Sequence, residues 1–294
     1  MLTADSGGAG ARTLAAWDAF VAQAEQADLH AVARAKGRLG REVLLPLGRW
    51  PQTRSLADIL SDAYEGRTTP AVDLERDERA VLAAHAGASD AEVVDALRLA
   101  RDDLAALLSG GDLPDVAARL TASPLGPLPV LTLLHAVAYQ LAVSALDLEP
   151  CGVAPSHDLL EWGVIALVDT TGALAARQGV TGSITAVLPT ASWGFGAAGG
   201  TWRTARLEHA DVIAGPAVEA EARVILDVTS GRELNVPALW HDRSLVTHDL
   251  PGLLRLVPVL DQVPGIPGGA ALRTIAHAVS RVGGLLGRLP AWPF

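Results

Sequence analysis

The chain has 294 residues, 50% of them hydrophobic and 19% charged, so it can bury a large core, and intrinsic disorder is excluded. Its 23 Lys and Arg against 33 Asp and Glu give a net charge of −10, and no basic run departs from that balance. A surface that tracks phosphates is therefore excluded, and nucleic acid is a poor partner.

Cysteine usage and the N-terminal residues indicate the compartment. Cys151 is the single cysteine, which excludes an internal disulfide and a cysteine-based zinc site. No charged-then-apolar leader opens the chain, so we expect a cytoplasmic protein. Of the 23 basic residues only Lys36 is a lysine, and with abundant Ala, Gly and Val this indicates a GC-rich, actinobacterial type of genome.

Apolar residues recur at helical spacing in three segments of the first 110 residues. We predict helices over 13–35, 56–64 and 89–109, the last of them ended by a pair of glycines. The polar, charged stretch 65–85 is interpreted as a connection between the second and third helices.

Two of these helix starts carry a capping signature. Ser55 is followed three residues later by Asp58, and Ser89 by Glu92, which is the spacing of a capping box. We therefore expect Ser55 and Ser89 to be the residues that begin their helices.

Residues 128–146 carry no formal charge and are nearly long enough to cross a bilayer. The segment nevertheless holds several polar side chains and lacks an aromatic belt or a basic flank, so we predict no membrane span. A buried helix over 129–148 is the better interpretation, followed by a further helix over 158–178 with Ser156 and Asp158 as its cap.

Beyond residue 182 the pattern changes to β-branched and aromatic alternation, which predicts strands. The expected strands are 184–188, 193–195, 202–207 and 210–214. A helix over 216–229 and a short apolar helix over 253–260 follow. We predict an α+β protein with a helical domain over 1–180 and a small α+β domain with a C-terminal tail over 181–294.

Three local motifs resemble the mycothiol-dependent maleylpyruvate isomerase family. They are Thr53–Asp62 (TRSLADILSD), Gln140–Leu148 (QLAVSALDL), and Ala210–Ala217 (ADVIAGPA) with the following Gly231–Arg232. The resemblance implies a DinB-like four-helix bundle followed by a small sterol-carrier-like α+β domain. It also implies a divalent metal, zinc, and mycothiol as the thiol cofactor.

The family's metal ligands are two histidines and a glutamate, and they fall here on Asp62, Gln140 and Ser144. An amide oxygen and a hydroxyl are weak zinc ligands, so we expect the site to be degenerate. In the simplest interpretation these three side chains hydrogen-bond to one another across the bundle centre. A rebuilt metal site, for which Asp58 and Asp62 lie four residues apart on one helix, is the alternative; His135 and Asp147 lie too far apart along their helix to share it.

Other chemically suggestive residues have simpler explanations. We interpret His241–Asp242 and His248–Asp249 as turns, Ser156–His157–Asp158 as a helix cap, and Cys151 as a core residue. The glycine-rich run 194–200 is expected to connect two strands of a hairpin.

Two functional hypotheses follow. The first is a divergent, metal-free relative of the family that binds a small or apolar molecule; the alternative is a metal-dependent thiol transferase or isomerase with a rebuilt ligand set. A role in assembly is a third possibility, which an exposed apolar patch at 253–257 would favour. Substrate and oligomeric state are not indicated by the sequence.

Overall fold

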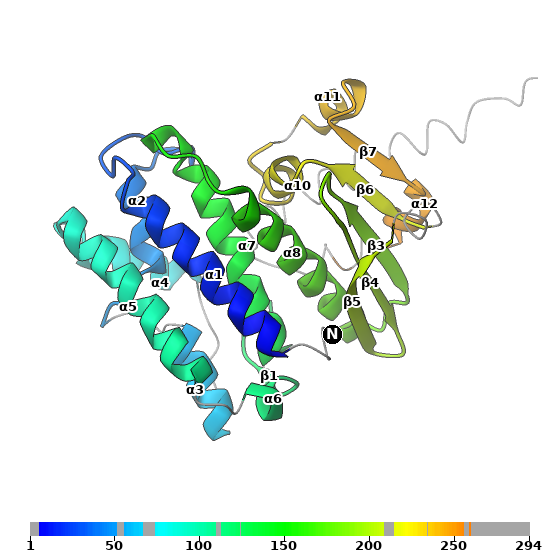
Figure 1. Cartoon of the computed structure of the whole chain (residues 1–294), viewed down its shortest axis with the longest axis horizontal. Helices are drawn as coiled ribbons and strands as arrows, with labels where there is room; N and C mark the ends of the chain where they lie inside the picture. The colour runs from blue at the N-terminus through cyan, green and yellow to red at the C-terminus, as the bar shows by residue number, and fades with distance from the viewer. Residues whose placement is uncertain are drawn as a thin grey trace, which may run out of the picture.

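The computed structural model describes residues 6–51, 56–66, 74–109, 113–123, 125–208, 215–233, 235–255 and 259. These residues form a mixed helix-and-sheet protein, which agrees with the predicted α+β class. Figure 1 shows most of the helices gathered on one side and the sheet, with the last short helices, on the other.

The helices that precede the sheet cover most of the first 177 residues. Their bounds are α1 Ser6–Ala24, α2 Gly40–Leu44, α3 Leu56–Glu65, α4 Leu74–Ala84, α5 Asp90–Ser109, α6 Leu113–Val116, α7 Val130–Asp147 and α8 His157–Arg177. Two short 3-10 helices, η1 Leu45–Leu47 and η2 Glu149–Cys151, and a small antiparallel pair, β1 Leu120–Thr121 with β2 Leu128–Pro129, connect them.

The sheet has the strand order β5-β4-β3-β6-β7. Its strands are β3 Gly182–Val187, β4 Ser192–Ala198, β5 Thr201–Leu207, β6 Ala217–Ala220 and β7 Leu245–His248. Adjacent strands are antiparallel except β3 and β6, which are parallel. The short helices α10 Ala222–Thr229, α11 Val236–His241 and α12 Leu250–Leu254 complete this part.

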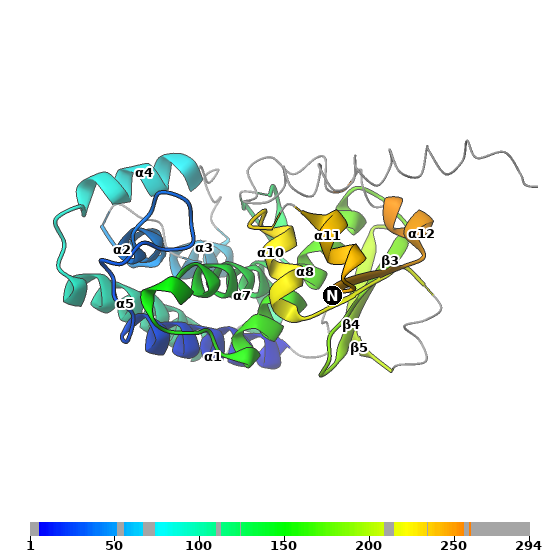
Figure 2. The same cartoon turned by 90° about the horizontal axis from the view of Figure 1, so that it is seen from above.

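Helices α7 and α8 lie side by side at the centre of the molecule (Figure 2). Both are long and apolar enough to cross a membrane, but 72% and 67% of their most apolar windows are buried inside the protein. The predicted buried helix over 129–148 is therefore confirmed. Its apolar side chains serve the core, and Pro129 lies at its N-cap, where no helical N–H is needed.

The sheet packs directly on α8, so one hydrophobic core runs from α1 to the strands. Gly172 permits this close approach, because a Cβ there would lie 2.7 Å from Cδ1 of Trp202 and 2.9 Å from Cγ of Phe195. The predicted domain boundary at 180 falls between α8 and β3, and the division into two domains stays a prediction.

Three sequence predictions of element extent were wrong. The first helix begins at Ser6 and ends at Ala24 rather than spanning 13–35. Residues 25–39, here called the 25–39 strap, instead form turns that lie against the C-terminal end of α7 and against η2. The Asp28 amide donates to the Cys151 carbonyl of η2, and the Arg34 amide donates to the Asp147 carbonyl of α7. Long-range backbone bonds of this kind outweigh the helical pattern of the segment.

The second error lies in the polar stretch 65–85, which contains α4. This helix is a surface element on which Val81 is fully buried, so its apolar stripe is too narrow to reveal it. The third is the helix expected over 216–229, which is β6 followed by α10. Residues 217–220 are a strand because they pair with β3 and β7, which are remote in sequence.

Two predicted caps are confirmed. At Ser89 the hydroxyl accepts from the Glu92 amide, and the Glu92 carboxylate accepts from the Ser89 amide, so the capping box that begins α5 is complete. Ser156 caps α8 by accepting from the Leu159 amide. Ser55, the predicted strand 210–214 and most of the predicted helix 253–260 lie outside the described residues; α12 ends at Leu254.

Candidate functional site

One face of α7 carries the polar residues of the second motif. Gln140, Ser144 and Asp147 are spaced at i, i+4 and i+7, so they follow one another along the same side of the helix. Gln140 is exposed, Ser144 is half-buried and Asp147 is buried. This polar α7 face is the candidate functional site.

Asp62, the third predicted metal position, lies on α3 and is half-buried. Helix α3 packs mainly against α5 and β1 and only marginally against α7. Arg119, just before β1, donates to the carbonyls of Ala63 and Tyr64 and so holds the C-terminal end of α3. Asp58, which could pair with Asp62 in a rebuilt metal site, instead accepts a hydrogen bond from Arg49 at 2.7 Å.

The donor set at these positions does not fit zinc. It offers a single carboxylate, an amide and a hydroxyl, whereas zinc prefers imidazole, thiolate or carboxylate ligands. Within the described ranges, no three His, Cys, Asp or Glu side chains gather at a spacing that would hold a metal ion. Gln140 is exposed, so it does not lie at the bundle centre, where the mutual hydrogen bonding was expected; that hydrogen bonding stays a prediction.

Asp147 instead anchors an arginine, which sequence reasoning did not pair with it. Arg232 donates to both oxygens of Asp147, from Nε at 2.9 Å and from Nη2 at 2.5 Å. These hydrogen bonds raise the pKa of Arg232. Both residues lie in sequence motifs, Gln140–Leu148 and Gly231–Arg232, and that was the one available signal for the pair.

Further ion pairs lie where α7, α10 and the 25–39 strap meet, and together with Asp147–Arg232 they are called the ion-pair seam. Arg34 of the strap contacts Asp227 of α10 at 2.7 Å, and Arg223 pairs with Glu149 just after α7. Next to the seam, the Tyr139 hydroxyl donates a hydrogen bond to Thr229 Oγ1 at 3.4 Å. Burial raises the pKa of Tyr139 to about 12. The seam holds α10 against the end of the polar α7 face.

A second polar centre, also missed in the sequence, is buried between α7, α8 and the sheet. His135 Nδ1 lies 3.0 Å from Asp169 Oδ2, with His135 4% and Asp169 1% exposed. Burial raises the pKa of Asp169, but the hydrogen bond and charge of His135, with bonds from Thr204 and Trp202, outweigh it and hold the pKa below its usual value. The partners are 34 residues apart, so local spacing carries no signal for them.

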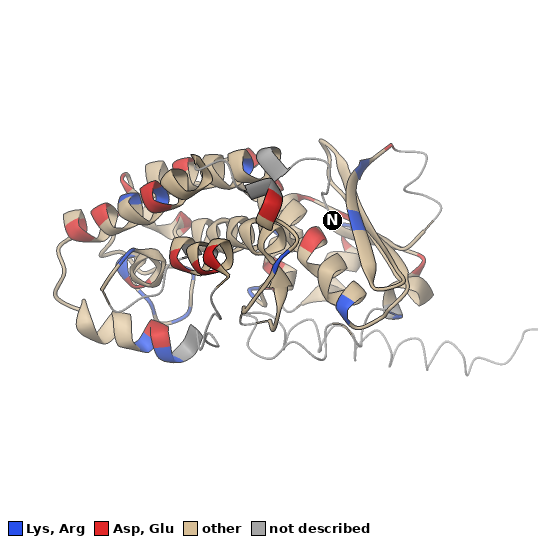
Figure 3. Ribbon diagram, turned by 90° about the horizontal axis from the view of Figure 1, so that it is seen from below, with Lys and Arg blue, Asp and Glu red and all other residues tan. Residues whose placement is uncertain are grey.

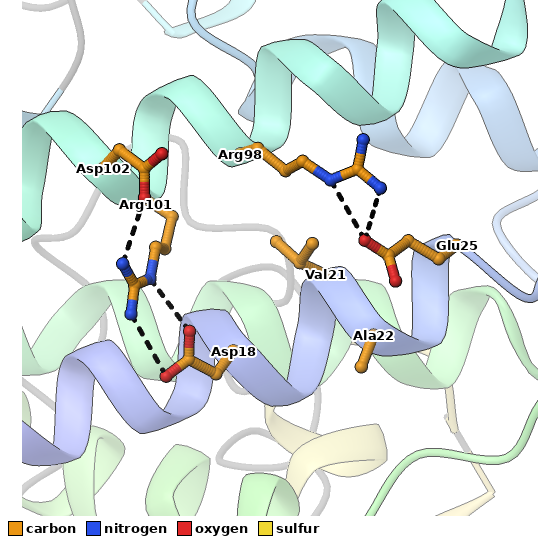
Figure 4. A pocket seen from close by; sticks show the side chains of 7 residues that line it. All are labelled: Asp18, Val21, Ala22, Glu25, Arg98, Arg101 and Asp102. Atoms are coloured by element: carbon orange, nitrogen blue, oxygen red, sulfur yellow. Dashed lines mark hydrogen bonds and ion pairs between the residues drawn. The ribbon is translucent and has the colours of Figure 1, made fainter.

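A shallow surface groove lies between α1 and α5 (Figure 4). Ion pairs cross it, from Arg101 to Asp18 at 2.9 Å and from Arg98 to Glu25 at 2.6 Å. Its charged groups are thus already neutralised by one another. Figure 3 shows the same intermixing of acidic and basic residues along the helices.

The remaining sequence candidates have structural roles. Cys151 is buried in the core, as predicted, and burial raises its pKa. His248 pairs with Glu219 at 3.1 Å, while Asp249 caps α12 by accepting from the Gly252 amide. The predicted hairpin forms between β4 and β5, but only Gly199 and Gly200 connect its strands; residues 194–198 of the glycine-rich run belong to β4.

The motif ADVIAGPA is only partly described: residues 210–214 lie outside the described ranges, and the rest leads into β6. Of the apolar residues at 253–257 whose exposure would favour a partner surface, Leu253 is half-buried, and the side chains of 254, 256 and 257 are not among those described.

This arrangement defines an α+β protein in which the sheet packs on α8, the last helix before the strands. Solved structures that share it include the mycothiol-dependent maleylpyruvate isomerase and a histidine-to-alanine variant of that enzyme. Each matches with a TM-score of 0.52 at 12% identity, covering 78% of this chain and 90% of the other. No protein-family model and no curated protein matches the sequence. The likeness shows the fold and a distant structural relationship.

Proposed function

We propose that this chain is a divergent relative of the maleylpyruvate isomerase fold, with a DinB-like bundle and a sterol-carrier-like second part, that binds a small or apolar molecule without a metal. The ligand would lie along the polar α7 face. The observation that carries this proposal is the donor set at the family's ligand positions, where Asp62, Gln140 and Ser144 stand in place of two histidines and a glutamate.

The chemistry of the α7 face supports binding rather than metal-assisted catalysis. Gln140 and Ser144 present an amide and a hydroxyl, which donate and accept hydrogen bonds but do not activate a thiol or water at neutral pH. At the end of the same face, Arg232 is held in place by hydrogen bonds to both oxygens of Asp147. Such a set suits orientation of a ligand by a few polar contacts.

The metal half of the proposal is tested by elemental mass spectrometry on tag-free protein and by calorimetric titration with zinc chloride. We expect metal well below one equivalent and no zinc-binding heat. Near-stoichiometric metal that is lost in Asp62→Ala would overturn the proposal and favour the alternative, a thiol-dependent transferase or isomerase with a rebuilt ligand set.

The binding half is tested with 8-anilinonaphthalene-1-sulfonate, an apolar anion. The variant Gln140→Glu adds one negative charge to the α7 face, and Gln26→Glu adds the same charge at an exposed position beyond α1. We expect Gln140→Glu to weaken probe binding about tenfold, which corresponds to about 1.4 kcal/mol, and Gln26→Glu to leave it unchanged. Equal binding by both variants and the wild type would show that the probe does not use this face.

A further inference from the structure

The buried carboxylate of Asp169 joins three separate elements. Its Oδ2 contacts His135 Nδ1 of α7 at 3.0 Å, and its Oδ1 accepts from Thr204 Oγ1 at 2.7 Å and Trp202 Nε1 at 3.0 Å, both on β5. We propose that Asp169 and these three partners form a polar lock that fixes the sheet on the helices, and that without it the sheet opens as a unit while the other helices stay folded.

Close to Asp169, the contact between α8 and the sheet is apolar among the described residues. Gly172, one turn beyond Asp169, lies against Trp202 and Phe195, and Phe195 and Ala197 of β4 are buried beside it. Apolar burial stabilises this contact but is non-directional. The hydrogen bonds to Asp169 therefore set the position of β5 along α8, because each requires a short, aligned approach.

The lock is buried, which makes its loss costly. Asp169 is 1%, Thr204 2% and His135 4% exposed, so no water replaces a lost bond without opening the interface. Replacing the carboxylate with an amide leaves one acceptor oxygen for three side chains that now share two, and breaking one side of a buried pair is strongly destabilising. If the sheet separates from α8, the unsatisfied groups regain hydrogen bonds to water. We therefore expect the loss of structure in the variant to be confined to the interface between α8 and the sheet.

Elsewhere α8 offers a matched control on the same helix. Glu161 accepts from Thr190 Oγ1 at 2.9 Å, which is also a bond between α8 and the sheet region, but this bond is exposed to solvent and Glu161 is only half-buried. Glu161→Gln makes the same carboxylate-to-amide change as Asp169→Asn, near the surface rather than in the core. An exposed hydrogen bond of this kind contributes little to stability.

The test is amide hydrogen exchange of the full chain, followed by mass spectrometry of peptides from β3–β5 and from α5. In Asp169→Asn we expect exchange in β3–β5 on the order of 100-fold faster or more, with α5 protection retained. Glu161→Gln should leave both regions unchanged. Equal loss of protection in both regions, or no loss in β3–β5, would overturn the lock.

The milder variant Thr204→Val keeps the proposal testable if Asp169→Asn does not fold. It removes one donor while preserving the shape of the side chain. We expect faster exchange confined to β3–β5, by about fivefold to tenfold, and protection equal to wild type in that region would overturn the proposal. This inference does not depend on the proposed function, because the lock and the polar α7 face involve different residues.

Discussion

At the residue scale, the two most deeply buried carboxylates of the described residues are matched by hydrogen-bond donors. Asp169 and Asp147 are 1% and 2% exposed, and each carboxylate accepts hydrogen bonds at both oxygens. Their partners lie 34 and 85 residues away in the sequence. A sequence pattern that identifies the helix of each Asp therefore says nothing about what neutralises it, which is why neither pair was predicted.

The lowered pKa of Asp169 makes its contribution to stability depend on pH. A carboxyl group whose pKa is lower in the folded state than in the unfolded state stabilises the folded state when the pH is above its usual pKa of 3.8. This stabilisation is lost as the pH falls through the pKa of the folded state. We expect the free energy of unfolding of Asp169→Asn to lie about 3–5 kcal/mol below wild type at pH 7.

That gap should narrow as the pH is lowered past 3.8, which urea unfolding followed by circular dichroism at a series of pH values measures. Glu161→Gln serves as the control, with a stability close to wild type throughout. A gap that stays constant down to the lowest pH would show that the charge of Asp169 is not what stabilises the fold.

At the element scale, local signals located most helices but not all of their ends. The caps at Ser89 and Ser156 begin α5 and α8 as expected, because a cap depends on residues within one turn. By contrast, α4 is too exposed to show a broad apolar stripe, and β6 is a strand only because its neighbours supply hydrogen bonds.

The close approach of α8 to the sheet predicts the effect of adding one methyl group. In Gly172→Ala the new Cβ would lie under 3.0 Å from side-chain atoms of Trp202 and Phe195, so those side chains or the strands that carry them must shift. We expect a loss of about 1–3 kcal/mol in the free energy of unfolding, measured by urea titration.

The matched substitution Gly196→Ala tests whether the effect is steric. Gly196 is an exposed residue of β4 with no atom within 4 Å of an added Cβ and no left-handed backbone angle. Its replacement should leave stability unchanged or slightly raised. An equal loss in both variants would refute the explanation by close packing.

At the scale of the whole molecule, the helices and the sheet share one hydrophobic core. Its buried side chains extend from Ala16 of α1 through α7 and α8 to Phe195 and Ala220 of the sheet. The two helices at its centre have the composition of membrane spans, and their burial explains that composition without a bilayer. The core therefore couples the two parts that the change in sequence texture separates.

This shared core predicts that the wild-type protein unfolds in one cooperative transition. Far-UV circular dichroism reports mainly on the helices, and the fluorescence of Trp193 and Trp202 adds a signal from the sheet. Because the two parts unfold together, the urea curves from the two probes should coincide. In Asp169→Asn the fluorescence curve should move to lower urea than the dichroism curve. Separate transitions in the wild type would indicate two independent units divided near residue 180.

The sequence by itself determined the class of the protein, the order of the long helices and of strands β3 to β5, the caps at Ser89 and Ser156 and the buried character of α7, because these depend on periodicity and on contacts within a turn. Only the tertiary structure decided which polar residues meet. It placed Gln140 in solvent, joined Asp147 to Arg232, and set His135 and Asp169 against β5. Such contacts are made between residues far apart in the chain, and their geometry follows from how helices and sheet pack, which no local pattern encodes.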